Sequence, residues 1–208
     1  RCVNSVLPDV KGRERLPLPA FMRLTDEKKR ALADAAIREF SAAPYDKVSV
    51  FKIARSAGIS RSGFYYYFTG KEDIYRYLLE LLENDFYTSL PERIDIFCVP
   101  VRMLEHFAAF KGTEMQNFVE RVLENLKPSV HTHFSAPFLG SLSPFPVTLL
   151  GLEQFRSRDP IDMRIFFFLS FSCTVLALQR YYQKDISLDN ARAFLERTLE
   201  MLRCGVCR

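Results

Sequence analysis

The sequence lacks the motifs of several enzyme and metal-binding classes. It has no tryptophan, and its five cysteines are too few and too scattered for the disulfide framework of a small secreted domain. No phosphate-binding loop, GxSxG or HExxH motif is present. Cys204 and Cys207 have no second pair to complete a zinc site, and His106, His131 and His133 have no acidic or cysteine cluster beside them. We therefore expect no catalytic centre, no metal and no cofactor.

Long apolar runs are also missing. The longest, Ile165 to Leu178, has 14 residues and is interrupted by Ser170, Ser172 and Thr174. A helix needs about 18–20 apolar residues to span a bilayer. The N-terminus lacks the basic segment and apolar run of a signal peptide. We therefore expect a cytoplasmic protein with no membrane partner.

Apolar and aromatic side chains are plentiful. Hydrophobic residues make up 48% of the 208 residues and aromatic residues 13%, including 19 phenylalanines. This composition can bury the core of one large or two small domains. Residues 1–76 hold 15 Lys and Arg against 9 Asp and Glu, whereas residues 77–208 hold 14 against 16. A basic N-terminal part is typical of a surface that meets phosphate groups.

Two short helices joined by a tight turn are predicted over residues 50–57 and 61–68. An apolar stripe at helical spacing runs along the first helix. Ser49 and Ser60 precede the two helices, where a hydroxyl can cap the first free amides, and Gly58 permits a left-handed turn. The second helix carries small residues near its start and Arg and Tyr on its outer side. These features suit the DNA major groove, which admits one helix.

This stretch resembles the DNA-binding domain of the TetR family of bacterial transcriptional regulators, over roughly Leu24 to Leu82. The family often has Gly where this chain has Pro44, and Arg where it has Phe51. The resemblance implies an all-α protein with an N-terminal three-helix helix-turn-helix domain and a larger helical domain for ligand binding and dimerisation. The matching pieces are Ile53-Ala54, Ala57-Gly58-Ile59-Ser60, Gly63-Phe64-Tyr65-Tyr66-Tyr67-Phe68 and Lys71-Glu72-Asp73.

Residue chemistry and this resemblance together predict the DNA contacts. Arg61 can bind guanine or phosphate, and the small side chains after it let the backbone approach the groove. Tyrosine hydroxyls and Lys71 suit phosphate contacts, which set register. Tyr67 lies beside the buried edge of its helix, so packing in the core is its alternative. The predicted contacts are Ser49, Arg61, Ser62, Gly63, Tyr65, Tyr66, Tyr67 and Lys71.

Three regions are expected: a mobile extension over residues 1–22, the helix-turn-helix domain over residues 23–70, and a body over residues 71–208. The helix predicted near residues 160–183 is apolar all round, which indicates burial against a second subunit. The resemblance likewise implies a homodimer through the last two long helices. The remaining helices are predicted near residues 26–40, 71–86, 91–110, 114–126, 147–156 and 188–202, with a loop over residues 127–146.

A small apolar or aromatic effector is expected in the body. We predict a ligand-responsive regulator, a repressor, that binds a near-palindromic double-stranded DNA operator as a dimer. The alternatives are a ligand-independent architectural DNA-binding factor and an all-helical enzyme with an incidental helix-turn-helix. Gln116, Asn117, His131, His133 and Gln154 are the polar candidates for the pocket. Its aromatic candidates are Phe107, Phe110, Phe118, Phe134, Phe138 and Phe155.

Overall fold

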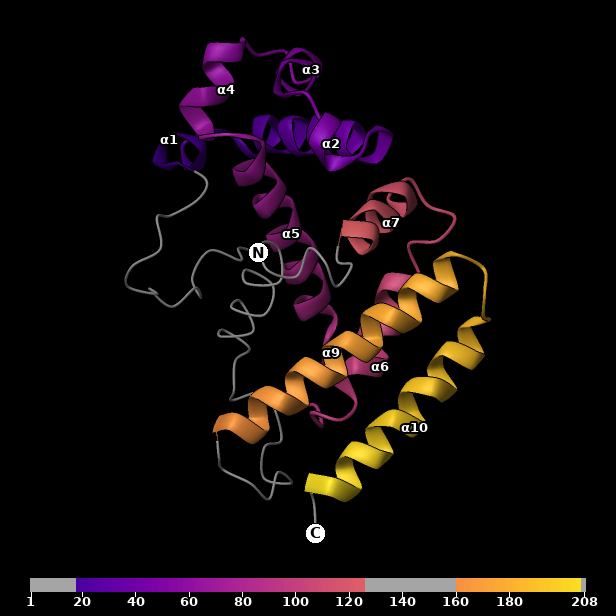
Figure 1. The fold of residues 1–208 in the computed structure, drawn as a ribbon. Helices are drawn as coiled ribbons and strands as arrows, with labels where there is room; N and C mark the ends of the chain where they lie inside the picture. The colour runs from indigo at the N-terminus through magenta and orange to yellow at the C-terminus, as the bar shows by residue number, and fades with distance from the viewer. Residues whose placement is uncertain (1–17, 126–159, 207–208) are drawn as a thin grey trace. The chain divides into compact units, whose positions relative to one another are not determined.

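The computed structural model describes residues 18–125 and 160–206 of the chain (Figure 1). Within these residues the secondary structure is helical, with no β-strand. The chain forms two compact units, Arg1–Asn84 and Asp85–Arg208. The division lies beyond the boundary expected at residue 70, because Ile74, Tyr75 and Leu78 are buried in the first unit.

The N-terminal unit consists of short and long helices (Figure 1), and its core is rich in aromatic side chains. Local signals set the helix starts: at the beginning of α2, the Thr25 side chain accepts a hydrogen bond from the Lys28 amide, and Asp26 and Glu27 complement the helix dipole. The helices of this unit, the last of which continues past Asn84, are α1 (Pro19–Met22), α2 (Asp26–Ala42), the 3-10 turn η1 (Tyr45–Lys47), α3 (Val50–Ser56), α4 (Arg61–Tyr67) and α5 (Lys71–Ser89).

The C-terminal unit is organised around its longest helix. Helix α9 packs against the other three, and α9 and α10 run side by side (Figure 1). Tyr182 at the end of α9 donates a hydrogen bond to the Phe107 carbonyl at 2.8 Å, and the Lys111 ammonium donates to the Tyr181 carbonyl at 3.0 Å. The complete helices of this unit that the structure describes are α6 (Val99–Ala108), α7 (Gln116–Asn125), α9 (Pro160–Tyr182) and α10 (Leu188–Val206).

Helix α9 contains a window, Ile165–Tyr182, that is long and apolar enough to cross a membrane. In this structure 44% of that window is buried inside the protein, and α9 contacts α6, α7 and α10. These contacts are those of the core helix of a globular unit.

One predicted helix is wrong in its extent. Residues 91–98 form bends, a single β-bridge at Ile94 and a turn, rather than the first part of a helix over residues 91–110, and α6 begins only at Val99. Asp95 holds this turn by accepting a hydrogen bond from the Phe97 amide at 3.0 Å. Pro100, expected to disturb the helix, lies in the first turn of α6. Amides in a first turn have no acceptor within the helix, so a proline there removes no helical hydrogen bond. The predicted loop 127–146 and helix 147–156 lie outside the described residues.

Candidate nucleic-acid interface

The start of α3 and the turn after it are held by local hydrogen bonds and one glycine. The Ser49 hydroxyl accepts a hydrogen bond from the Lys52 amide at 3.5 Å, and the Ser49 amide donates to Glu39 Oε1 on α2 at 3.2 Å. Gly58 adopts a φ of 70°, a conformation that residues with a side chain rarely take. The turn between α3 and α4 is therefore defined by backbone geometry that the sequence predicts.

Helix α4 has a capped start and a buried inner side. The Ser60 hydroxyl accepts a hydrogen bond from the Gly63 amide at 3.0 Å. A Cβ atom at residue 63 would lie only 3.2 Å from that hydroxyl oxygen, so glycine at this position leaves room for the cap. Phe64 and Phe68 are fully buried and fix which side of α4 faces the core.

The outer side of α4 presents hydrogen-bond donors and a positive charge. Arg61 and Ser62 are exposed, and Tyr65 and Tyr66 are 44% and 64% exposed. The Arg61 guanidinium lies 5.9 Å from the centroid of the Tyr65 ring. Helix α4 carries no Asp or Glu. Guanidinium and hydroxyl groups are the donors that contact base edges and phosphate oxygens.

Two of the predicted DNA contacts have partners inside the N-terminal unit. Tyr67 is half-buried, and its ring centroid lies 6.4 Å from that of Phe21, which supports its alternative role in packing. The Lys71 ammonium donates to the carbonyls of Tyr45 and Asp46 at 2.9 and 3.0 Å. An ammonium has three N–H donors, so one is left over for a phosphate.

The structure corrects the expectation of a mobile extension over residues 1–22 where it describes them. Pro19–Met22 forms helix α1, and Phe21 is 1% exposed. The Phe21 ring packs against Phe68 and Tyr77, with centroids 5.0 and 4.9 Å apart. Sequence reasoning missed this support of α4, although Pro19 followed by a large apolar residue is a helix-start signal.

Residues 32–78 match the family model described as bacterial regulatory proteins, tetR family. These residues form a TetR-family helix-turn-helix. The match covers every predicted DNA contact from Ser49 to Lys71 and confirms the resemblance seen in the sequence. Residues 32–78 of the chain therefore carry the DNA-binding domain of this family. No curated protein matches it.

Solved structures of TetR-family regulators share the fold at low sequence identity. A regulator from Rhodococcus sp. RHA1 is 14% identical, with a TM-score of 0.58 over 88% of this chain and 99% of its own. One from Streptomyces coelicolor is 22% identical, with a TM-score of 0.58 over 86% and 81%. The fatty acid degradation regulator FadR from Bacillus halodurans is 20% identical, with a TM-score of 0.57 over 89% and 100%. These likenesses confirm the all-α TetR-type fold.

The predicted effector-binding phenylalanines that the structure describes lie in the core and beside a histidine. Phe118 on α7 is 1% exposed. Phe107 and Phe110 pack on the His106 ring, with centroids 5.2 and 5.6 Å away. Phe134, Phe138 and Phe155 lie outside the described residues, as do His131, His133 and Gln154.

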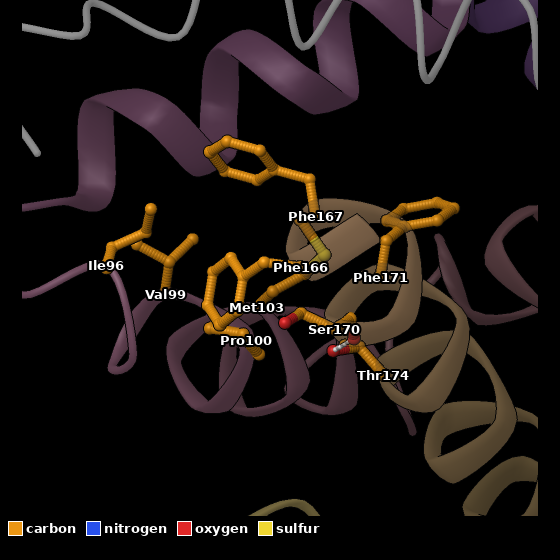
Figure 2. Close-up of a pocket in the computed structure, with 9 residues that line it drawn as sticks. All are labelled: Ile96, Val99, Pro100, Met103, Phe166, Phe167, Ser170, Phe171 and Thr174. Atoms are coloured by element: carbon orange, nitrogen blue, oxygen red, sulfur yellow. Dashed lines mark hydrogen bonds between the residues drawn. The ribbon is translucent and has the colours of Figure 1, made fainter. Parts of the chain in front are cut away.

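A hollow in the C-terminal unit is lined by other residues (Figure 2). On one side are Ile96, Val99, Pro100 and Met103, from α6 and the turn before it. On the other side lie five residues of α9, and the cavity volume is about 30 Å³. None of the described phenylalanines predicted to bind the effector is among the lining residues. The α9 residues are Phe166, Phe167, Ser170, Phe171 and Thr174.

Proposed function

We propose that this protein is a ligand-responsive repressor that binds a near-palindromic DNA operator as a homodimer. The observation that carries the DNA part of the proposal is the outer side of α4, which presents Arg61, Ser62, Tyr65 and Tyr66 to solvent without an acidic side chain. A regulator of this kind works where the chromosome is, and we expect it in the cytoplasm.

Within the operator complex, α4 enters the major groove of one half-site. Arg61 near its start reaches a base edge, and Ser62 and Gly63 bring the backbone close to the groove. Tyr65 and Tyr66 then contact the phosphates on either side of the groove.

Two further contacts come from helix starts. The third N–H of Lys71 is directed to phosphate, while the other two hold the loop before α3. Ser49 lies at the start of α3, where a hydroxyl and free amides suit a phosphate oxygen. Tyr67, half-buried against Phe21, supports the helix from behind and contributes a contact only through its exposed edge.

The homodimer is proposed to form through α9 and α10. Ile165, Phe168 and Leu176 on α9 are 51%, 51% and 46% exposed, and they recur at helical spacing on the side opposite the hollow. Phe194 and Met201 on α10 are 43% and 60% exposed. Adjacent helices with such apolar sides mark an interaction surface. A second copy of the chain fits it, because a two-fold dimer matches a palindromic operator.

The effector is proposed to bind in the C-terminal unit and to change the spacing of the two DNA-binding units in the dimer. A ligand shifts such an equilibrium only if it binds one arrangement better than the other. Release of the operator is therefore expected to scale with this difference in affinity.

Substitutions at Arg61 test the DNA-binding part. An operator is first selected from a random duplex library, and binding is then followed by fluorescence anisotropy over a series of salt concentrations. Arg61→Ala should cost about 1–3 kcal/mol at the selected site and relax the preference at one base pair. Arg61→Lys is the matched control, because lysine keeps the positive charge but lacks the guanidinium group that can donate two parallel hydrogen bonds to one base. Equal binding of every duplex by the wild type and both variants would refute the proposal.

One observation favours the architectural alternative, a DNA-binding protein without an effector. The hollow measures about 30 Å³, whereas pockets for small molecules usually occupy about 300–1,000 Å³. The architectural alternative predicts that no small molecule binds in the C-terminal unit. It also predicts that operator affinity stays the same in the presence of each compound tested.

A further inference from the structure

The hollow between α6 and α9 contains a buried hydroxyl that makes no hydrogen bond within the part of the chain that the structure describes. Ser170 is 4% exposed, and its Oγ has no hydrogen-bond partner among residues 18–125 and 160–206. Figure 2 shows this hydroxyl directed toward Pro100 and Met103. A buried hydroxyl without a hydrogen bond destabilises a fold by about 1–3 kcal/mol, so an unused one inside a hollow indicates a missing partner.

The neighbouring hydroxyl is already engaged. Thr174 Oγ1, fully buried one turn later, donates to the Ser170 carbonyl at 2.8 Å. Thr174 can therefore only accept a further hydrogen bond, whereas the Ser170 hydroxyl is free to donate as well as accept. Among the described residues that line the hollow, Ser170 is the one whose side chain can donate a hydrogen bond to a guest.

The other described residues around the hollow are apolar. Phe166, Phe171 and Met103 are 2%, 8% and 8% exposed, and no Lys, Arg or His is among the described residues that line the space. An anionic group placed there would be desolvated without a counter-charge, which is strongly unfavourable. A neutral hydroxyl or carbonyl loses far less hydration free energy when it moves from water into the hollow. It also gains a hydrogen bond from the Ser170 hydroxyl.

The hollow can become larger if side chains in its lining move. Met103 has an unbranched, flexible side chain of the kind that adapts to irregular shapes. Phe167 also lines the hollow and is only half-buried (Figure 2). A guest larger than about 30 Å³ can enter if these two side chains move.

We propose that this hollow is the effector site and that Ser170 selects a small uncharged molecule with an apolar body and one alcohol or carbonyl group. The proposal rests on the function proposed above and names the class of its effector. Ser170 donates to the oxygen of the guest, and the aromatic walls cover its hydrocarbon part.

The experiment uses three probes of nearly equal shape: 2-phenylethanol, its hydrocarbon counterpart ethylbenzene, and its acid counterpart phenylacetate. Binding to the full chain without DNA is followed by the methyl NMR signal of Met103, with the exposed Met22 of the N-terminal unit as the reference. The variants are Ser170→Ala, Ser170→Thr and the matched control Ser172→Ala, a serine on the same helix outside the lining.

We expect 2-phenylethanol to shift the Met103 signal and to bind about 3- to 10-fold more weakly to Ser170→Ala than to wild type. Ser170→Thr should restore most of that affinity, and Ser172→Ala should not change it. Ethylbenzene should bind wild type and Ser170→Ala alike, and phenylacetate should bind at least about 10-fold more weakly than the alcohol. Removing an unpaired hydroxyl should leave the fold of Ser170→Ala at least as stable as wild type.

Three results would overturn the proposal: no shift of the Met103 signal with any probe, equal binding of 2-phenylethanol by wild type and Ser170→Ala, or tightest binding of phenylacetate. Operator binding by the same variants is measured separately. Failure of wild type to bind any operator would refute the proposed function and leave the probe result intact. Binding of the probe without operator release would refute the effector role of the hollow.

Discussion

Phe21 offers the sharpest test of how α4 is held in place. Its side chain is 1% exposed and lies between α4 and the start of α5, with the Phe68 and Tyr77 rings 5.0 and 4.9 Å away. Beside it, the Leu18 amide donates to the carbonyl of Tyr67, the last residue of α4, at 3.1 Å. Phe21→Ala would leave a cavity against the inner side of α4.

The expected loss is large compared with the stability of such a unit. Truncation of a buried Phe to Ala costs about 3–5 kcal/mol, and small domains are stable by only about 5–15 kcal/mol. Met22 is the matched control, because it is the next residue on the same helix and is 60% exposed. Met22→Ala should change the free energy of unfolding by less than about 0.5 kcal/mol.

Urea unfolding gives the free-energy difference, and hydrogen exchange of the α4 amides locates it. In Phe21→Ala, the amides of Arg61–Tyr67 should exchange faster, whereas those of α10 should not change. Operator affinity should fall with the loss of α4 structure. Deletion of residues 1–22 should have the same effect as Phe21→Ala. The packing role of Phe21 would be refuted if Phe21→Ala and Met22→Ala had the same free energy of unfolding and the same hydrogen-exchange protection of the α4 amides.

Three other perturbations follow from the structure. Lys71→Met should lower the free energy of unfolding by about 1–3 kcal/mol, because it removes the two hydrogen bonds that the ammonium donates to the carbonyls of Tyr45 and Asp46, and unchanged urea unfolding would contradict this. Burial, together with repulsion from Glu80, raises the pKa of Glu83 to about 8 from its ordinary 4.5. The folded state therefore keeps a proton that the unfolded chain releases above pH 4.5, and stability falls as the pH rises toward 8. Glu83→Gln should remove this fall in melting temperature between pH 5 and pH 8.5 (about the span of the shift), and parallel pH profiles would contradict it. Leu176→Glu should place an unpaired carboxylate in the proposed α9–α10 dimer contact and give monomer in sedimentation, whereas an unchanged dimer would place the contact elsewhere.

Most helix starts of the N-terminal unit could be predicted from the sequence because their signals are local. Thr25, Ser49 and Ser60 each accept a hydrogen bond from an amide three residues later, and Gly58 needs no distant partner for its left-handed turn. The apolar stretch Ile165 to Leu178 likewise indicates the long helix α9. The same local reasoning misplaced α6, because Pro91 and Pro100 are both acceptable in a first helical turn and only the turn around Asp95 decides between them.

Contacts between residues far apart in the chain were decided by the tertiary structure. Lys71 binds carbonyls 26 and 25 residues away, and these partners reduce its role as a free phosphate contact. The described phenylalanines predicted to bind the effector do not line the hollow, because the lining depends on which residues of α6 and α9 face each other. Ser170 reads in the sequence as a small interruption of an apolar helix. The packing of α9 on α6 places its buried hydroxyl beside the hollow, without a hydrogen-bond partner among the residues that the structure describes.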